Sequence, residues 1–324
     1  MAEEFPVTYE DVLEARKRLQ SRIYKTPLEH SRHLSNDHAN YYLKLESQQV
    51  TKSFKVRGAL NKLTLLAQNR GQKKVVAVSS GNHGAGVSYA ASSMPDIDAT
   101  IFVPEITPEA KIEKIKYYGA SIRIEGKNFN EALKIGRDYC RRNDLIMVEP
   151  DSDREVIAGQ GTIAQEILDQ NPAIDTIIVP VGGGGLITGI AVAAKHLRPD
   201  ISIIGVQTEA CPSFIKSLED NKLYEEFPIE DSICDGLVGG IGKIPFQMAA
   251  ECIDDIITVK EKSIRSAVPF IIGEEKCMSE PAGAAGVAAV RENPYQFGGD
   301  EIAIIISGGN IDGKLVKELF KEEY

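Results

Sequence analysis

Four consecutive glycines follow a hydrophobic segment in the stretch VPVGGGG at positions 179–185, at the start of a helical pattern. Because glycine has no Cβ, backbone N–H groups can approach an anion closely, and a helix N-terminus adds partial positive charge. The stretch therefore predicts a phosphate-binding loop without a basic side chain. An ordinary tight turn between strand and helix is the alternative. No Gly-Lys-Ser/Thr sequence follows, so the loop does not match a Walker motif.

A lysine between apolar neighbours is the second candidate for chemistry. Lys55 lies in SFKVRG at 53–58, before a segment of good helix formers. Cationic neighbours such as Lys52 and Arg57 favour the neutral, nucleophilic form of a lysine amine. The alternative is a solvated surface lysine.

Two polar loops also follow strand patterns: SSGNHG at 79–84 and SGGN at 307–310. The first offers hydroxyls, an amide and free backbone N–H groups that could hold a carboxylate, or it is an ordinary helix cap. In an open α/β sheet, ligands bind beyond the carboxyl ends of the strands. Since all three loops lie at such ends, we expect them to form one site.

Short β-branched runs alternate with amphipathic segments along the chain, which is typical of parallel sheets covered by helices on both faces. Thr107 is predicted as an N-cap, with Pro108 at the first helical position. Strands are predicted at 74–79, 99–103, 121–124, 145–148, 176–180, 202–207, 256–259 and 301–306. Helices are predicted at 84–91, after Pro108, at 130–142, from Gly159 to Asp169, at 189–196, up to Val290, and at the C-terminal end.

Composition limits the class of protein. The 324 residues are 43% hydrophobic and 26% charged, which is ordinary for a globular chain with a sizeable core. With 37 Lys plus Arg and 47 Asp plus Glu, the net charge of −10 argues against nucleic-acid and anionic-membrane partners. No apolar run reaches transmembrane length, and the N-terminus has no signal-peptide pattern. The five scattered cysteines predict free thiols in a reducing, cytoplasmic compartment.

Taken together, the motifs resemble those of one family. SFKVRGA at 53–59, SSGNHG at 79–84, GGGG at 182–185 and SGGN at 307–310 resemble the fold-type II pyridoxal-phosphate enzymes, more narrowly the threonine dehydratase and serine racemase family. VIAGQGTIAQE at 156–166 and EPAGAAG at 280–286 are similar too. The resemblance implies an α/β fold of two doubly wound domains with mostly parallel sheets, like the tryptophan synthase β chain. The smaller domain, 73–150, would be inserted in the larger, 1–72 and 151–324.

The resemblance also assigns roles. Lys55 would form the Schiff base with pyridoxal 5'-phosphate, and Phe54 would pack near the ring. Asn82 would hydrogen-bond the ring 3′-oxygen, and Ser307 would face the pyridine nitrogen. The phosphate would bind to Gly182, Gly183, Gly184 and Gly185. The substrate carboxylate would bind to the loop containing Ser79, Ser80 and His83.

The implied reaction is an α,β-elimination from L-serine or L-threonine, giving pyruvate or 2-oxobutanoate and ammonia. The cofactor is an electron sink, and the amine of Lys55 can take the Cα proton. The family analogy also implies a homodimer. An alternative is a serine racemase with side dehydratase activity, in which Ser80 acts on the opposite face from Lys55. Another is a dehydratase of a different β-hydroxy amino acid.

Two further classes are less favoured. A nicotinamide-dependent dehydrogenase would need a Gly-x-Gly-x-x-Gly pattern after a strand, which we do not find. A non-catalytic relative would not need Lys55, Asn82 and Ser307 together, because each has a separate chemical task.

Three positions depart from the family pattern. Lys52 stands where glycine is common. Ile215 stands where the divalent-metal site of animal racemases needs a carboxylate, although Glu209 is retained, so no metal site is predicted. Asp151 stands where Asn or an apolar residue is expected. With Glu149 and Asp153, Asp151 either belongs to a solvated acidic loop or places negative charge near the substrate β-substituent, which would disfavour hydroxyaspartate.

Overall fold

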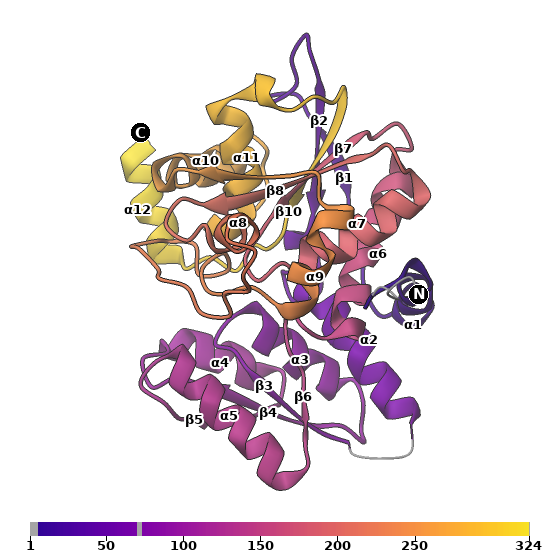
Figure 1. Cartoon of the computed structure of the whole chain (residues 1–324). Helices are drawn as coiled ribbons and strands as arrows, with labels where there is room; N and C mark the ends of the chain where they lie inside the picture. Colours follow the sequence, from indigo (N-terminus) through magenta and orange to yellow (C-terminus); the bar gives the residue numbers. More distant parts are fainter. Residues whose placement is uncertain (1–5, 70–72, 324) are drawn as a thin grey trace.

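The chain forms two separate β-sheets, which lie one above the other in Figure 1. The computed structural model describes residues 6–69 and 73–323. One sheet has six strands in the order β1-β2-β10-β7-β8-β9, and the other has four in the order β5-β4-β3-β6. The strands are β1 Leu28–Ser31, β2 Asn40–Leu45, β3 Lys74–Val78, β4 Asp98–Val103, β5 Ser121–Ile124, β6 Ile146–Met147, β7 Thr176–Pro180, β8 Ser202–Thr208, β9 Asp255–Val259 and β10 Glu301–Ile306.

Helices cover both sheets. Helices α3, α4 and α5 pack on the four-stranded sheet, whereas α7 and α11 pack on the six-stranded sheet. The α-helices are α1 Tyr9–Leu19, α2 Lys55–Gln68, α3 Asn82–Ser92, α4 Glu109–Tyr117, α5 Phe129–Asn143, α6 Arg154–Gln170, α7 Gly185–Leu197, α8 Ser213–Glu219, α9 Lys243–Cys252, α10 Glu261–Gly273, α11 Pro281–Glu292 and α12 Gly313–Glu323. Short 3-10 helices span Glu46–Gln48 and Pro294–Gln296.

Both sheets are almost entirely parallel, which confirms the α/β fold class. Within the described residues, only β1 and β2 pair in the antiparallel sense. The central strand β10 pairs with β2 and β7, so that Ile304 lies opposite Leu43 and Ile178. The carboxyl ends of β3, β7 and β10 lead directly into the three loops singled out from the sequence.

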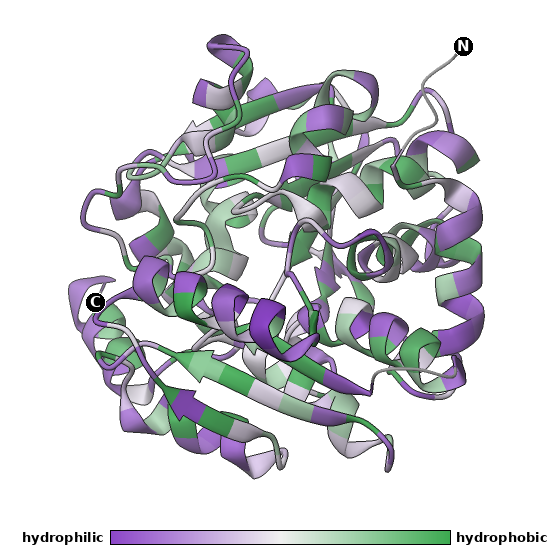
Figure 2. Ribbon diagram, turned by 60° about the horizontal axis from the view of Figure 1, so that its bottom comes forward, coloured by the Kyte–Doolittle hydropathy of each residue, from purple (hydrophilic) through white to green (hydrophobic). Residues whose placement is uncertain are grey.

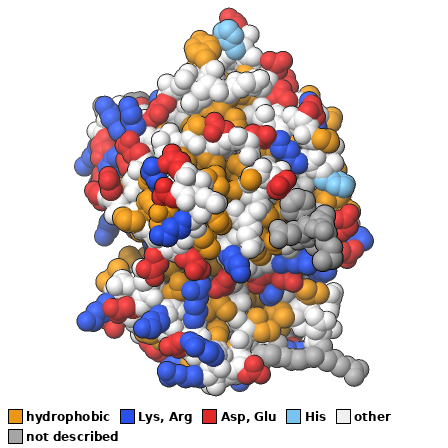
Figure 3. All heavy atoms as spheres, viewed as in Figure 1, with side chains coloured by type: hydrophobic (Ala, Val, Ile, Leu, Met, Phe, Trp, Pro, Cys, Tyr) orange, Lys and Arg blue, Asp and Glu red, His pale blue; other side chains and the backbone are white. Residues whose placement is uncertain are grey.

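The strands are hydrophobic because helices bury them on both faces. In β10, the residues from Ile302 to Ile306 are all fully buried. Figure 2 shows hydrophobic residues concentrated in the strands and hydrophilic ones on the outer faces of helices. Figure 3 shows acidic and basic side chains interspersed over the outside, with a waist between the two units. Across that waist, Lys111 of α4 forms an ion pair with Asp235.

Three predicted helix starts are wrong. Thr107 is not an N-cap: its hydroxyl has no hydrogen-bond partner, and Pro108 holds the cap position of α4. Helix α6 begins at Arg154 rather than after Gly159, because Asp153 accepts hydrogen bonds from Glu155 N and Val156 N. Gly159 lies inside α6, where a Cβ would meet Gly58 of α2 at 2.6 Å, so this glycine permits a close helix crossing.

The third wrong helix start is that of α7. This helix begins at Gly185, directly at the glycine loop, and not at Gly189. The segment before Lys55 was not predicted. It contains α1, β1 and β2, although Thr8 and Asp11 form a recognisable capping box at the start of α1.

The five cysteines are free, as predicted, and all five are buried. Burial raises the pKa of Cys140 to about 11 and that of Cys252 and Cys277 to about 12, so these thiols are unreactive. Among the described residues, no helix has the length and hydrophobicity needed to cross a membrane. The same residues contain no group of three or more His, Cys, Asp or Glu side chains that could hold a metal ion. The first five residues, where a signal peptide was sought, lie outside the described part.

Candidate active site

Lys55 is the first residue of α2, and the segment before it is fixed to the end of the central strand. Phe54 N donates to Ser307 O at 3.1 Å, and Ser53 forms an isolated bridge with Gly308. Phe54 and Ser307 are themselves buried. This arrangement places the lysine at the carboxyl edge of the six-stranded sheet, where its side chain remains 17% exposed.

The backbone of Lys52 explains why glycine suits that position. Its φ is +61°, in the left-handed region that side chains with a Cβ rarely adopt. Lys52 O accepts a hydrogen bond from Gly309 N at 2.9 Å, which ties this turn to the last loop of the site. The side chain is exposed. The constraint at this position is therefore on the backbone.

The glycine loop after β7 has no room for side chains. A Cβ on Gly182 would meet Gly236 O at 2.4 Å, and one on Gly183 would meet Asp151 Oδ2 at 2.5 Å. Gly184 has a φ of +94° and Gly185 opens α7. Neighbouring protein atoms therefore occupy the positions that side chains would take, while the backbone N–H groups of the loop lie at the positive end of a 13-residue helix. These features fit a bound phosphate group.

Asp151 joins the lysine to this loop. Its Oδ1 lies 3.2 Å from Lys55 Nζ and accepts a hydrogen bond from Gly185 N at 3.2 Å. The Asp151 side chain is 20% exposed. A single carboxylate therefore contacts both the lysine amine and the glycine loop, although Lys55 and Asp151 are separated by 96 positions in the sequence.

The loop after β3 lies against the start of α2. A Cβ on Gly86 of α3 would be 3.2 Å from the Lys55 carbonyl carbon. His83 Nε2 bonds to Val148 O at 2.8 Å, and its Nδ1 has no partner among the described atoms. Burial, together with the Lys55 charge, lowers the pKa of His83 to about 4. The imidazole is therefore neutral at pH 7, so it contributes no positive charge for a substrate carboxylate.

The two serines of this loop differ in their contacts. Ser79 Oγ accepts a hydrogen bond from Gly81 N at 3.2 Å. Ser80 is partly exposed, and within the described residues its hydroxyl has no hydrogen-bond partner. The Ser80 hydroxyl therefore has both its donor and its acceptor positions open, whereas the Ser79 hydroxyl accepts one hydrogen bond and keeps its proton to donate.

Sequence reasoning missed Glu280, a partly buried residue directly before α11. Asn82 Nδ2 donates to Glu280 Oε1 at 2.7 Å, and Asn82 Oδ1 accepts from Asn310 Nδ2 at 2.6 Å. These two contacts fix which way the Asn82 amide faces. Burial raises the pKa of Glu280. The signal was present, since EPAGAAG at 280–286 matched the family, but no role was attached to its acidic residue.

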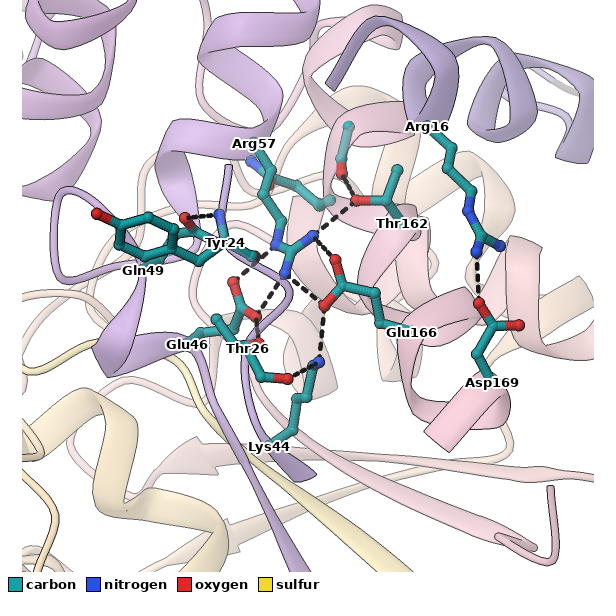
Figure 4. Close-up of polar contacts among 12 residues, drawn as sticks. Arg16, Tyr24, Thr26, Lys44, Glu46, Gln49, Arg57, Thr162, Glu166 and Asp169 are labelled. Carbon is teal, nitrogen blue, oxygen red and sulfur yellow. Dashed lines mark hydrogen bonds and ion pairs between the residues drawn. The ribbon is translucent and has the colours of Figure 1, made fainter. Parts of the chain in front are cut away.

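A second ionic group surrounds the side chain of Arg57, two residues after Lys55 in α2 (Figure 4). Arg57 donates two hydrogen bonds to Glu46 and two to Glu166, at distances between 2.7 and 2.9 Å. Lys44 Nζ bonds to Glu166 and to Thr26 O, both at 2.7 Å. We call Lys44, Glu46, Arg57 and Glu166 the buried ion cluster. It joins β2, α2 and α6 and has no exposed cation.

The fold and site define a class: a two-sheet α/β enzyme with a lysine beside a glycine loop that can hold an anion. A family model described as "Pyridoxal-phosphate dependent enzyme" matches residues 19–308. The chain belongs to this family, and within it to the group of threonine dehydratases and serine racemases.

Relatives with known names support that placement. The chain is 39% identical over 318 residues to the L-threonine ammonia-lyase of Thermotoga maritima, covering 98% of this chain and 79% of the relative. The structure of maize serine racemase superposes with a TM-score of 0.89 at 31% identity, covering 98% of each chain. Threonine deaminase isoform 2 from Solanum lycopersicum gives a TM-score of 0.89 at 31% identity, covering 97% of this chain and 92% of that one.

Proposed function

We propose that this protein is a pyridoxal-phosphate-dependent ammonia-lyase that converts L-serine to pyruvate and L-threonine to 2-oxobutanoate. The observation that carries the proposal is the lysine amine held beside the glycine loop, with Asp151 Oδ1 3.2 Å from both Lys55 Nζ and Gly185 N. The relative from Thermotoga maritima, named an L-threonine ammonia-lyase, supports the choice of substrates.

The residues present fit the cofactor. Gly182 to Gly185 would hold its phosphate, Lys55 would bond to it, and Phe54, Asn82 and Ser307 would contact its ring. When bound, the cofactor supplies an electron sink that stabilises negative charge at the substrate Cα. Ser307 is neutral, so it provides no carboxylate to keep the ring nitrogen protonated. Negative charge at the substrate Cα would then be delocalised less into the ring, which favours rapid loss of the β-substituent.

The remaining steps belong to side chains of this chain. The loop from Ser79 to His83 binds the substrate carboxylate, with the N–H groups at the start of α3 as donors. The Lys55 amine takes the Cα proton, and the β-hydroxyl leaves as water. One water molecule is consumed when the amino nitrogen of the substrate is released as ammonia. The net reaction therefore converts the amino acid to a keto acid and ammonia.

The direct test is to load the purified protein with cofactor and incubate it separately with L-serine and L-threonine. We expect pyruvate and 2-oxobutanoate, each equimolar with ammonia, measured by coupled reduction of the keto acid. No keto acid from either substrate, in protein that carries the cofactor absorbance band, would refute the proposal.

Racemisation of serine is a second candidate function, which the unpartnered hydroxyl of Ser80 favours. A racemase needs a second proton donor on the face opposite Lys55, and Ser80 is available for that role. Chiral chromatography of the L-serine reaction separates the cases. D-serine that disappears in Ser80→Ala, while pyruvate formation persists, would support the racemase. If wild type forms pyruvate but no D-serine, the enzyme is a dehydratase only.

We further propose that residues 73–150 form a smaller domain inserted in a larger one, 1–72 and 151–324. The separate sheet β5-β4-β3-β6 supports this division. The homodimer and the cytoplasmic location stay predictions. Gel filtration with light scattering tests the first, and cell fractionation tests the second.

A further inference from the structure

Three carboxylates lie close together in sequence at 149, 151 and 153, and the structure gives them different tasks. Glu149 pairs with Arg137 of α5 at 2.9 Å. Asp153 caps α6 and pairs with Lys62 at 3.1 Å. Only Asp151 faces Lys55 and the glycine loop. The acidic run is therefore not simply a solvated loop.

The position of Asp151 is fixed by its backbone. A Cβ on Gly185 would lie 3.0 Å from Asp151 Cα, and one on Gly242 would lie 2.4 Å from Asp151 O. The next residue, Ser152, accepts a hydrogen bond from Lys243 N at 3.0 Å. Gly242 N in turn donates to Gly183 O at 2.9 Å. Because both flanks are packed, the backbone of this segment keeps the Asp151 carboxylate within side-chain reach of Lys55 and the glycine loop.

The charge of Asp151 has few partners. Lys55 is the one cation within ion-pair distance among the described residues, and Gly185 N is the one backbone donor. The imidazole of the neighbouring His83 is neutral. Once the Lys55 amine is engaged by the cofactor, the ammonium that balances Asp151 is no longer free.

We propose that Asp151 makes this site select substrates by the charge of their β-carbon substituents. Amino acids with a neutral hydroxyl or a cationic amino group at the β-carbon are accepted, and those that also carry a β-carboxylate are rejected. This inference rests on the proposed function, because it concerns the substrate of the same site. A unit charge about 6–12 Å away, at an effective dielectric constant of about 20, changes kcat/KM by about 10- to 100-fold.

The test compares three substrates in the cofactor-loaded enzyme. L-Serine gives pyruvate and ammonia, threo-3-hydroxy-L-aspartate gives oxaloacetate and ammonia, and L-2,3-diaminopropionate plus water gives pyruvate and two molecules of ammonia. In Asp151→Asn, we expect kcat/KM for hydroxyaspartate relative to serine to rise about 10- to 100-fold. The value for diaminopropionate relative to serine should fall. Glu149→Gln, which removes the same charge two residues away, is the matched control and should leave both ratios unchanged.

A binding measurement separates selection from chemistry. Spectral titration gives dissociation constants for L-alanine and L-aspartate, which have no β-leaving group. We expect Asp151→Asn to tighten L-aspartate about 10-fold or more relative to L-alanine, and Glu149→Gln not to do so. If Asp151→Asn does not fold, Asp151→Ser removes the same charge with a smaller side chain. The same changes in the substrate ratios and in the binding ratio are then expected for Asp151→Ser.

The outcomes distinguish the two proposals. Wild type that turns over none of the three substrates refutes the proposed function. Wild type that consumes serine, while Asp151→Asn leaves the substrate ratios and the binding ratio unchanged, refutes only the role of Asp151. Equal changes in Glu149→Gln would also refute it, because the effect would then come from the net charge of the loop.

Discussion

Lys55 and Arg57 are two residues apart in the first turn of α2, yet their side chains differ in burial and in the number of hydrogen bonds that they make. Arg57 is fully buried and makes hydrogen bonds to two carboxylates and to Thr162. Lys55 is partly exposed and has one carboxylate neighbour at 3.2 Å, which also accepts a hydrogen bond from the glycine loop. Two cations on one helical turn therefore face different surroundings.

The contrast shows what a buried charge needs. Burial by itself lowers the pKa of Arg57, but Glu46 and Glu166 together raise this pKa by more than burial lowers it. The guanidinium therefore stays charged. Its hydrogen bonds are satisfied, which leaves no donor for a ligand and makes the buried ion cluster a structural clamp. The Lys55 amine has unsatisfied hydrogen-bonding capacity and access to solvent, so it remains available for bonding to another molecule.

Removal of the Lys55 amine should have the largest effect. We expect Lys55→Ala to lower kcat/KM for L-serine by at least about 10³-fold, because it removes both the cofactor anchor and the proton acceptor. The absorbance band of bound cofactor should also be lost, and added methylamine should restore part of the activity. Lys52→Ala, which removes an exposed charge three residues earlier, is the control. An active Lys55→Ala protein would contradict the assignment.

Removal of the Arg57 guanidinium should affect stability most. Arg57→Met leaves Glu46 and Glu166 buried with Lys44 as their remaining cation, at a cost of about 3–5 kcal/mol. Arg57→Lys should fall between, because an ammonium cannot bond both carboxylates in a bidentate manner. Urea unfolding measures the difference.

The matched control is Arg16→Met, which breaks the exposed pair with Asp169 and should cost less than about 1 kcal/mol. If Arg57→Met were as mild as Arg16→Met, the buried ion cluster would not be a clamp.

The buried imidazole next to Lys55 predicts a pH dependence of stability. The pKa of His83 falls from 6.5 to about 4 on folding, so between these values the unfolded state binds the proton more readily. Stability is therefore complete above pH 6.5 and declines as pH falls towards 4, by at most about 1.4 kcal/mol per pH unit. His83→Gln should flatten this dependence, measured by urea unfolding between pH 7 and pH 4. Parallel curves for the two proteins would show that His83 titrates normally.

The left-handed residue before Lys55 should give the smallest effect. Lys52→Gly should stabilise the protein by about 0.5–1 kcal/mol, because glycine adopts a φ of +61° without strain. Lys52→Ala removes the same charge but keeps the Cβ, so its melting temperature should stay close to that of wild type. Equal stabilisation by Ala and Gly would mean that charge, rather than backbone strain, is responsible.

Much of the site could be predicted from the sequence because its parts are local. The glycine run, the polar loops at 79–84 and 307–310, and Lys55 each stand next to a hydrophobic strand or a helix pattern. Since parallel strands end at one edge of a sheet, placing the loops at strand ends was enough to bring them together. The family resemblance rests on the same local motifs.

The partners across the site could not be predicted, because they are distant in sequence. Glu280 meets Asn82 across 198 positions, and Asp151 meets Lys55 across 96. Neither separation leaves a periodic signal. The tasks of Asp151 and Asp153 were also undecided, because they depend on where α6 begins, and that start was predicted several residues too late.

The sequence by itself determined the class of fold, the loops that form the site and the lysine at its centre, because strand patterns and glycine content act within a few residues. Only the tertiary structure decided which charged side chains have all their hydrogen bonds satisfied and which can still bind another molecule. That depends on the packing of β2, α2 and α6 around Arg57, and on the close contact of the 150–152 segment with the glycine loop. A buried charge keeps its reactivity only where packing leaves it a free bonding position.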